Sequence, residues 1–197
     1  MNRLDTSFWE NKYKNNTIGW DIGCVSTPLK MYFEQLKNKD LSILIPGCGN
    51  GYEAEFLYNL GFKNIHIIDI AKQPLQNFSN RIPDFPKENL ININFFKHRG
   101  TYDLIIEQTF FCAIDPILRN DYIEKMRQLL SPQGKLVGLL FDFPLTEQGP
   151  PFGGSKEEYT TNFSEKFRIK VLEKSYNSIE SRIGKELFAI FDAIDKC

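Results

Sequence analysis

Residues 43–53, with the sequence ILIPGCGNGYE, form the segment best suited to hold a small molecule. Gly47, Gly49 and Gly51 alternate with other residues between an apolar run and a helix-like pattern. Without Cβ atoms, the backbone there can turn tightly and lie against a ligand. The free N–H groups at the start of the following helix favour a negative group such as a carboxylate. Glycine also serves strand-to-helix turns that bind nothing, so the segment alone leaves both interpretations open.

An acidic residue favours the binding interpretation. Asp69 follows Gly51 by 18 positions and stands at the end of the next apolar run. A carboxylate at that place can accept hydrogen bonds from both ribose hydroxyls of an adenosine-containing cofactor. The alternative is that Asp69 caps a helix that begins near Ala71. The sequence therefore predicts a nucleoside site, with Asp69 as its acid.

Among such cofactors, S-adenosyl-L-methionine fits better than a dinucleotide. Tyr52 stands where the dinucleotide pattern GxGxxG has its third glycine. A dehydrogenase also usually needs a catalytic His, Lys or Tyr, and the chain has only His66 and His98, which we interpret as structural or solvated. S-adenosylmethionine has no phosphate, so its methionine carboxylate and amino group can lie along the glycine loop.

The apolar runs of the chain predict the sheet that positions these residues. Five runs are too continuous for strands with one exposed face and fit strands buried on both faces: 41–45, 64–70, 90–95, 102–106 and 135–141. Helical patterns lie between them at 52–60, 72–80 and 119–130. This alternation predicts a parallel sheet with right-handed crossovers.

The two ends of the chain add further elements. Helical patterns precede the first strand, at 7–14 and after Thr27, which we expect as the N-cap with Pro28 at the first helical position. A Pro/Gly-rich loop at 143–154 leads to a capping box of Ser155 and Glu158 and a helix to about Phe163. The last strands, 167–174 and 186–191, should pair antiparallel because too little chain separates them for a crossover.

The predicted fold class is therefore α/β: a Rossmann-like, class I methyltransferase sheet of seven strands. It is mostly parallel, with an antiparallel terminal hairpin and helices on both faces. The 197 residues, 42% of them hydrophobic, predict one domain over 1–197, with 1–37 as an N-terminal helical cap or lid.

Composition disfavours several classes of function. The net charge of −1 provides no long-range field for nucleic acid or an anionic membrane. No signal-peptide pattern or membrane span is visible, so we expect a cytoplasmic protein. Cys24, Cys48, Cys112 and Cys197 are far apart, and we expect reduced thiols, no disulfide and no metal site.

Six motifs, in order along residues 8–191, resemble the thiopurine S-methyltransferase family, and within it especially the plant-type halide and thiol methyltransferase branch. They are FWENKYKNNTIGWDIG, IPGCGNGYE, HIIDI, TYDLIIEQTFFCAIDP, GPPF and RIGKE. The resemblance implies cofactor contacts at Trp9, Tyr13, Trp20, Gly47, Asp69, Asn94, Phe95 and Gln108.

In the family, aromatic residues of the N-terminal segment lie over the cofactor, and a pair after the third strand flanks its adenine. Three positions depart from the plant pattern. Tyr13 replaces a Trp, Asn94 replaces an Asp, and Gln108 stands where the plant branch has Tyr and the thiopurine enzymes have Arg. Tyr13 keeps an aromatic face, and Asn94 can still bond an adenine amino edge. The position of Gln108 lies near the methyl acceptor, so this departure leaves the substrate open.

Methyl transfer from a sulfonium is an in-line displacement, for which the protein mainly aligns the reactants and excludes water. A thiolate, hydrosulfide or halide needs no strong base, which suits a chain with two histidines. An oxygen or amine acceptor would need a base, for which Glu107 is the candidate; its alternative role is to cap the next turn.

An acceptor pocket is predicted from the aromatic and proline residues of the same motifs. Its candidates are Phe110, Phe111, Pro151, Phe152 and Arg182, which would orient an anion. Phe110 and Phe111 are equally consistent with core packing, and Arg119 fits a structural role better. The prolines follow the fifth strand and not the fourth, which argues against the base-gripping loop of nucleic-acid methyltransferases.

The sequence thus predicts an S-adenosylmethionine-dependent methyltransferase that acts on a small soft nucleophile (thiol, hydrosulfide, halide or thiocyanate) and releases S-adenosyl-L-homocysteine. One alternative is another acceptor, such as a heteroaromatic thiol or a metalloid. The other is a silent module that only binds the cofactor. We expect a small-molecule acceptor, no nucleic acid or membrane partner, and a monomer.

Overall fold

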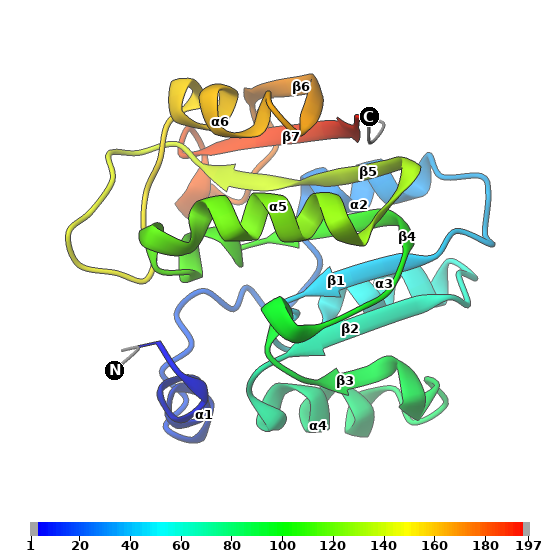
Figure 1. Cartoon of the computed structure of the whole chain (residues 1–197). Coiled ribbons are helices and arrows are strands. Elements are labelled where there is room, and N and C mark those ends of the chain that lie inside the picture. Colours follow the sequence, from blue (N-terminus) through cyan, green and yellow to red (C-terminus); the bar gives the residue numbers. More distant parts are fainter. Residues whose placement is uncertain (1–3, 195–197) are drawn as a thin grey trace.

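A seven-stranded sheet with the order β3-β2-β1-β4-β5-β7-β6 organises the chain (Figure 1). The computed structural model describes residues 4–194, so the prediction for Cys197 lies outside the described residues. The strands are β1 (Ile43–Pro46), β2 (Ile65–Asp69), β3 (Leu90–Asn92), β4 (Tyr102–Gln108), β5 (Leu130–Phe141), β6 (Phe167–Lys174) and β7 (Glu186–Ala193). Strands β1 to β5 pair in parallel, and β7 pairs antiparallel with β5 and β6. The predicted α/β sheet is confirmed.

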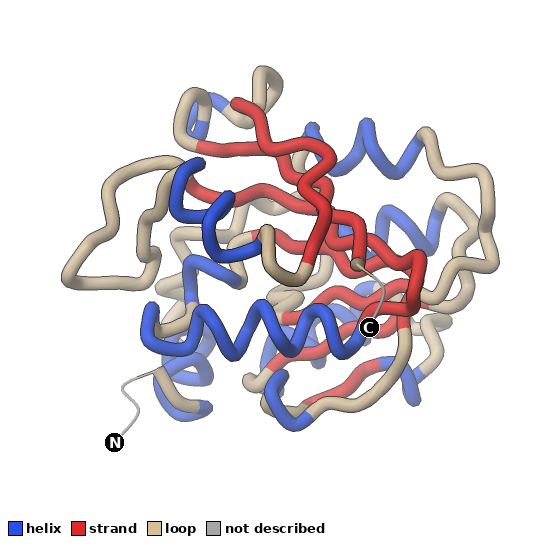
Figure 2. The backbone as a smooth tube through the Cα atoms, turned by 45° about the horizontal axis from the view of Figure 1, so that its top comes forward, coloured by secondary structure: helices blue, strands red, loops and turns tan. Residues whose placement is uncertain are grey.

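Helices cover both faces of this sheet, as the continuous apolar runs require (Figure 2). They are α1 (Thr6–Lys14), α2 (Thr27–Glu34), α3 (Tyr52–Asn59), α4 (Lys72–Arg81), α5 (Arg119–Leu129) and α6 (Lys156–Phe163). One core cluster joins the sheet to α2, α3 and α4, through residues such as Phe33 and Phe78. The other joins it to α5 and α6, through Tyr122 and Phe163. In Figure 1, α5 therefore lies in front of the sheet, and α2 and α3 lie behind it.

Two predicted helix boundaries were wrong. Helix α2 is capped by Ser26 and begins at Thr27, since the first helical bond runs from the Lys30 N–H to the Ser26 carbonyl. Helix α5 ends at Leu129, one residue before the predicted end at 130, because Leu130 already pairs with Tyr102 at the start of β5. Sheet pairing thus sets this boundary, and β5 begins at Leu130 instead of at the predicted 135.

Two other local predictions were also wrong. Strand β3 ends at Asn92, and Phe95 opens a short 3₁₀ turn instead of ending the strand. The predicted capping box forms only in half. The Ser155 hydroxyl accepts from the Glu158 N–H, but the Glu158 carboxylate pairs with Arg119, 2.5 Å away, instead of returning to the cap.

The carboxyl ends of the parallel strands meet at the left edge in Figure 1, and α1 lies beside the ends of β1 and β2. The long loop between β5 and α6 projects past the same edge. In an open α/β sheet this edge is where ligands bind. Within residues 4–194, no helix combines the length and the apolar character needed to cross a membrane.

Candidate active site

A cavity of about 680 Å³ opens at the carboxyl ends of β1, β2 and β4. Its walls come from the loops after these strands, the segment between α1 and α2, and the turn before β7. The volume lies in the range typical of small-molecule sites. Among the predicted site residues, those that line it are Trp9, Tyr13, Trp20, Gly47, Gly49, Asp69, Asn94, Phe95, Gln108, Phe110, Pro151 and Arg182.

The glycine loop needs its glycines for backbone geometry and for space. Gly47, Gly49 and Gly51 all have positive φ, at +58°, +54° and +73°, a region that other residues rarely adopt. A Cβ on Gly47 would lie 2.2 Å from the ring of Phe110, and one on Gly51 would lie 2.6 Å from Phe78. Gly47 and Gly49 line the cavity, whereas Gly51 caps α3 and does not.

Asp69 ties the ends of two neighbouring strands together. Its side chain is 7% exposed and accepts hydrogen bonds from the Gly49 N–H at 3.1 Å and the Ala71 N–H at 2.8 Å. It therefore supports the turn toward α4, but it is not the N-cap that the alternative predicted, because Ala71 holds that position; Asp69 also lines the cavity. Burial raises the pKa of Asp69 to about 6 against these two bonds. Each carboxylate oxygen keeps a further lone pair for a ligand hydroxyl.

Three aromatic side chains of the N-terminal segment form one cluster at the cavity. The Trp20 ring meets Trp9 and Tyr13 edge to face, with centroids 5.4 and 5.9 Å apart. A Cβ placed on Gly49 would lie 3.1 Å from the Tyr13 hydroxyl, so the cluster stands against the glycine loop. The arrangement offers aromatic faces and edges to a cationic or planar ligand.

Asn94 and Phe95 lie where the chain leaves β3. The Asn94 side-chain oxygen accepts the Phe96 N–H at 2.9 Å, which leaves the amide N–H₂ available. The Phe95 ring packs edge to face on Phe110, with centroids 5.2 Å apart. Together they place an amide donor and an aromatic ring at the end of the cavity that is nearest to β3.

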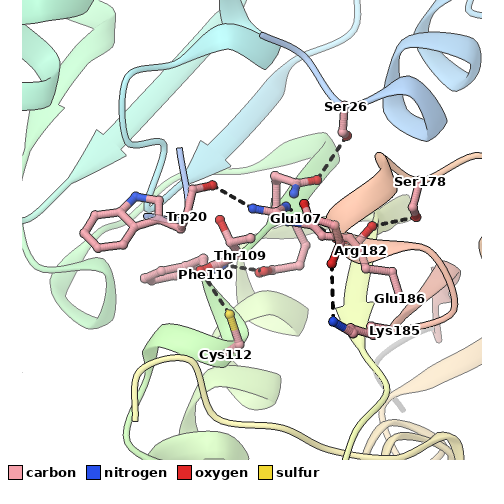
Figure 3. Close-up of polar contacts among 12 residues, drawn as sticks. Trp20, Ser26, Glu107, Thr109, Phe110, Cys112, Ser178, Arg182, Lys185 and Glu186 are labelled. Atoms are coloured by element: carbon pink, nitrogen blue, oxygen red, sulfur yellow. Dashed lines mark hydrogen bonds and ion pairs between the residues drawn. The ribbon is translucent and has the colours of Figure 1, made fainter. Parts of the chain in front are cut away.

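The opposite end of the cavity centres on Arg182, in the turn before β7 (Figure 3). Its guanidinium is buried and donates to the Trp20 carbonyl at 2.6 Å. It also pairs with Glu186 at 3.4 Å, and Glu186 in turn accepts from the Ser178 hydroxyl at 2.6 Å. A guanidinium has five N–H donors, so donors remain for a ligand.

Gln108, which departs from the plant pattern, is hydrogen-bonded to Ser26, the residue before α2. The Ser26 hydroxyl donates to its side-chain oxygen at 3.1 Å. The amide N–H₂ is left as a neutral donor at the cavity wall. Figure 3 shows how the segment that carries Ser26 and the turn that carries Arg182 converge on this end of β4.

Glu107 does not line the cavity. Its side chain is 2% exposed and accepts from the Phe110 and Phe111 N–H groups, at 2.7 and 2.9 Å, and from the Tyr122 hydroxyl. These bonds stabilise the turn at Thr109, whose φ of +56° is unfavourable for a β-branched residue. The geometry matches the capping role that the sequence left open.

Two members of the predicted acceptor pocket point elsewhere. Phe111 packs in the core against Tyr122 and Tyr159, with ring centroids 5.0 and 5.7 Å away. Phe152 lines a separate, smaller cavity of about 350 Å³. Arg119, buried at 4% exposure, binds Glu158 and the Gly153 carbonyl, which is a structural role.

Sequence reasoning assigned no role to Glu53, although it stands inside the quoted glycine motif. It is 6% exposed, lines the cavity, and is the second residue of α3. Ser26 was missed as well, because its partner Gln108 is 82 positions away. An acid directly after a glycine loop was the available signal for Glu53.

The residues present fit an adenosyl sulfonium amino acid. Gly47 and Gly49 line the cavity without side chains, the buried acid Asp69 stands beside them, and aromatic rings of the N-terminal segment line it as well. When bound, this cofactor would supply the methyl group to be transferred.

Comparison with known proteins agrees with this assignment. The family model described as thiopurine S-methyltransferase matches residues 4–195. Thiocyanate methyltransferase 1 of Arabidopsis thaliana is 29% identical over 189 residues, which cover 90% of this chain and 81% of the relative. The thiopurine S-methyltransferase of Vibrio vulnificus (strain YJ016) is 24% identical, with 92% of both chains covered.

A solved structure shows the same fold. It is the 1,6-didemethyltoxoflavin-N1-methyltransferase of Burkholderia thailandensis with bound S-adenosylhomocysteine, with a TM-score of 0.79 and 13% sequence identity. The match covers 96% of this chain and 87% of that one. Since the family model spans nearly the whole chain, the protein belongs to the thiopurine S-methyltransferase family and is an S-adenosylmethionine-dependent methyltransferase.

Proposed function

We propose that this enzyme methylates a small soft nucleophile: a thiol, hydrosulfide, halide or thiocyanate. The observation that carries the proposal is the buried guanidinium of Arg182, which lies 5.7 Å from the Phe141 ring centroid and lines the same cavity as Phe110 and Pro151. A cation among apolar side chains suits an anion that must lose its water before it attacks.

The state of Glu107 supports the same acceptor class. Both of its carboxylate oxygens are engaged in hydrogen bonds outside the cavity, and no histidine is among the described residues that line it. An acceptor that arrives as an anion, or as a thiol that ionises readily, needs no strong base at the site. The chain then has to bind, orient and desolvate the acceptor.

The names of the relatives point to the same chemistry and to one competitor. Arabidopsis relatives are called thiocyanate methyltransferase 1 and probable thiol methyltransferase 2. Bacterial relatives are called thiopurine S-methyltransferases, so a heteroaromatic thiol is the second candidate. Gln108 puts a neutral amide where the thiopurine enzymes have Arg, which favours the smaller acceptors.

We propose further that residues 1–37 act as a lid over the bound cofactor. Helix α2 is fixed in the core through Leu29 and Phe33, so the movable part would be the one before it. That part makes its polar contacts around the cavity mouth: Glu10 accepts from the Lys72 N–H, Asp21 binds the Asn50 amide, and the Trp20 carbonyl accepts from Arg182. Such a small set of contacts fits a segment that opens and closes.

An acceptor panel tests the proposal. Release of S-adenosylhomocysteine is measured with iodide, thiocyanate, hydrosulfide, small thiols and a thiopurine, with Asp69→Ala as the control that lacks the cofactor acid. We expect turnover with at least one of the small soft acceptors. Turnover restricted to the thiopurine would establish the second candidate, and turnover with none of the panel would refute both.

A further inference from the structure

Glu53 is a buried acid at the cavity that none of the roles above uses. It follows the glycine loop directly, as the second residue of α3, and its side chain is 6% exposed. It lines the same cavity as Gly47, Gly49 and Asp69. Acids at this helix position are common because they complement the helix dipole, but most of them are exposed to water.

The contacts of Glu53 leave its charge without a cationic partner. Backbone N–H groups of Ser26 and of Glu53 itself donate to the carboxyl. None of the ion pairs among residues 4–194 includes Glu53. The charge of Arg182 favours the ionised carboxyl, but Arg182 already binds Glu186 and the Trp20 carbonyl, and the negative charge of Asp21 opposes it.

Burial accordingly raises the pKa of Glu53 to about 7. A buried carboxylate with only neutral partners is costly, and the cost falls when a cation enters beside it. The wall of the cavity is thus built to receive a positive group at this point.

The sheet order tells which part of the ligand lies there. Along the edge, Phe95 follows β3, Asp69 ends β2, Glu53 follows β1, and Gln108 ends β4. Glu53 therefore lies between the nucleoside acid on one side and the acceptor end on the other. The amino acid portion of the cofactor is the part that we expect next to the glycine loop.

We propose that Glu53 binds the α-ammonium of the cofactor's methionine portion as its buried counter-charge. An ammonium has N–H donors that can bond a carboxylate, whereas the sulfonium has none. The ammonium also keeps its charge during methyl transfer, so an acid that binds it does not oppose the reaction. An acid that gripped the sulfonium would lose that interaction in the transition state.

The proposal rests on the cofactor and not on the identity of the acceptor, so it is tested by binding alone. The probes are S-adenosylhomocysteine and its des-amino analogue, which keeps the carboxylate and lacks the ammonium. Isothermal titration should show that the wild type prefers S-adenosylhomocysteine by at least about tenfold, and that Glu53→Gln loses most of this preference. Both ligands should bind Glu53→Gln with similar affinity.

Glu157→Gln is the matched control, because Glu157 is also the second residue of an eight-residue helix, is exposed, and does not line the cavity. It should keep the wild-type preference. If Glu53→Gln binds both ligands more weakly but retains the wild-type ratio, Glu53 is structural and the proposal is wrong. If Glu53→Gln does not fold, the wild type alone decides: equal affinity for the two ligands would refute an ammonium site.

Discussion

The guanidinium of Arg182 donates to the backbone carbonyl of Trp20, 162 positions away in the sequence, at 2.6 Å. One residue thus joins the turn before β7 to the N-terminal segment, and the same side chain lines the cavity at the end where we propose that the acceptor binds. Under the proposed closure, this bond couples the position of the N-terminal segment to the position of the Arg182 guanidinium. A change at Arg182 should affect both.

Arg182→Lys tests this coupling. Lysine keeps the charge but cannot bond Trp20 and Glu186 together as the planar guanidinium does. With S-adenosylhomocysteine bound, we expect trypsin to cleave the variant near Lys12 and Lys14 at least about threefold faster than the wild type. Arg168→Lys, an exposed change on β6 of the same hairpin, is the control. Equal cleavage rates in Arg182→Lys and wild type would show that the segment is held by other contacts.

Asp69→Asn should weaken cofactor binding. The amide offers one acceptor oxygen where the carboxylate offers two, and it carries no charge, so we expect a loss of about 1–3 kcal/mol in S-adenosylhomocysteine affinity by isothermal titration. Adenosine, which keeps the ribose, should lose affinity as well. Asp84→Asn changes an exposed aspartate and should have no effect. If Asp69→Asn bound adenosine as tightly as the wild type does, Asp69 would not be a ribose ligand.

Gly47→Ala should damage both stability and binding. The new Cβ would lie 2.2 Å from the Phe110 ring, on a backbone with φ of +58°. The left-handed conformation alone costs about 1–2 kcal/mol for a residue with a Cβ. Gly19→Ala is the matched control: Gly19 lines the same cavity, has no positive φ, and its Cβ would meet nothing within 4 Å. Similar melting temperatures for the two variants would contradict the geometry.

Glu107→Gln should change how stability depends on pH. Burial raises the pKa of Glu107 from 4.5 to about 7. An acid whose folded pKa exceeds its unfolded pKa stabilises the fold below about pH 4.5 and loses that contribution as the pH rises through about 7. For Glu107 this amounts to up to about 3 kcal/mol.

The measurement is urea unfolding at pH 5.5 and pH 8. The wild type should lose stability toward pH 8, and the loss should be smaller in Glu107→Gln, which is neutral at both values. Glu180→Gln changes an exposed glutamate and is the control; its free energy of unfolding should fall between pH 5.5 and pH 8 as much as that of the wild type. If Glu107→Gln lost as much unfolding free energy between pH 5.5 and pH 8 as the wild type does, the Glu107 carboxyl would already be ionised at pH 5.5.

The elements were predictable because their signals are local. Continuous apolar runs located the five parallel strands, two further strand-like runs located the terminal hairpin, and β6 has the predicted bounds, Phe167–Lys174. The glycine loop and the position of Asp69 also follow from nearby residues. The predicted ends of elements were wrong where pairing with another strand sets the boundary. At Leu130, for example, pairing with Tyr102 ends α5.

The contacts of the site residues were not predictable from the sequence, because they involve residues that are distant along the chain or depend on the exact geometry of a turn. Phe110 and Phe111 are adjacent and have the same side chain, yet the Phe110 ring lines the cavity and the Phe111 ring packs in the core. The positive φ of Thr109 and the bonds that both N–H groups donate to Glu107 fix this turn. Whether Glu107 is a base or a cap depends on Tyr122, which belongs to α5. No local pattern carries that information.

Gln108→Glu tests how charge at the proposed acceptor end of the cavity affects the choice of acceptor. The change keeps the size of the side chain and adds a negative charge to the cavity wall where Gln108 now presents an amide. An anionic acceptor would be repelled, and the new carboxylate would compete for Arg182. We expect the KM for thiocyanate to rise about tenfold, the effect of about 1.4 kcal/mol, with a smaller rise for an acceptor that binds as a neutral thiol.

Gln108→Met is the control: it removes the hydrogen bond from Ser26 without adding charge, so it separates charge repulsion from the loss of that contact. Equal rises in KM for the anion and the neutral thiol would mean that charge at this position does not select the acceptor.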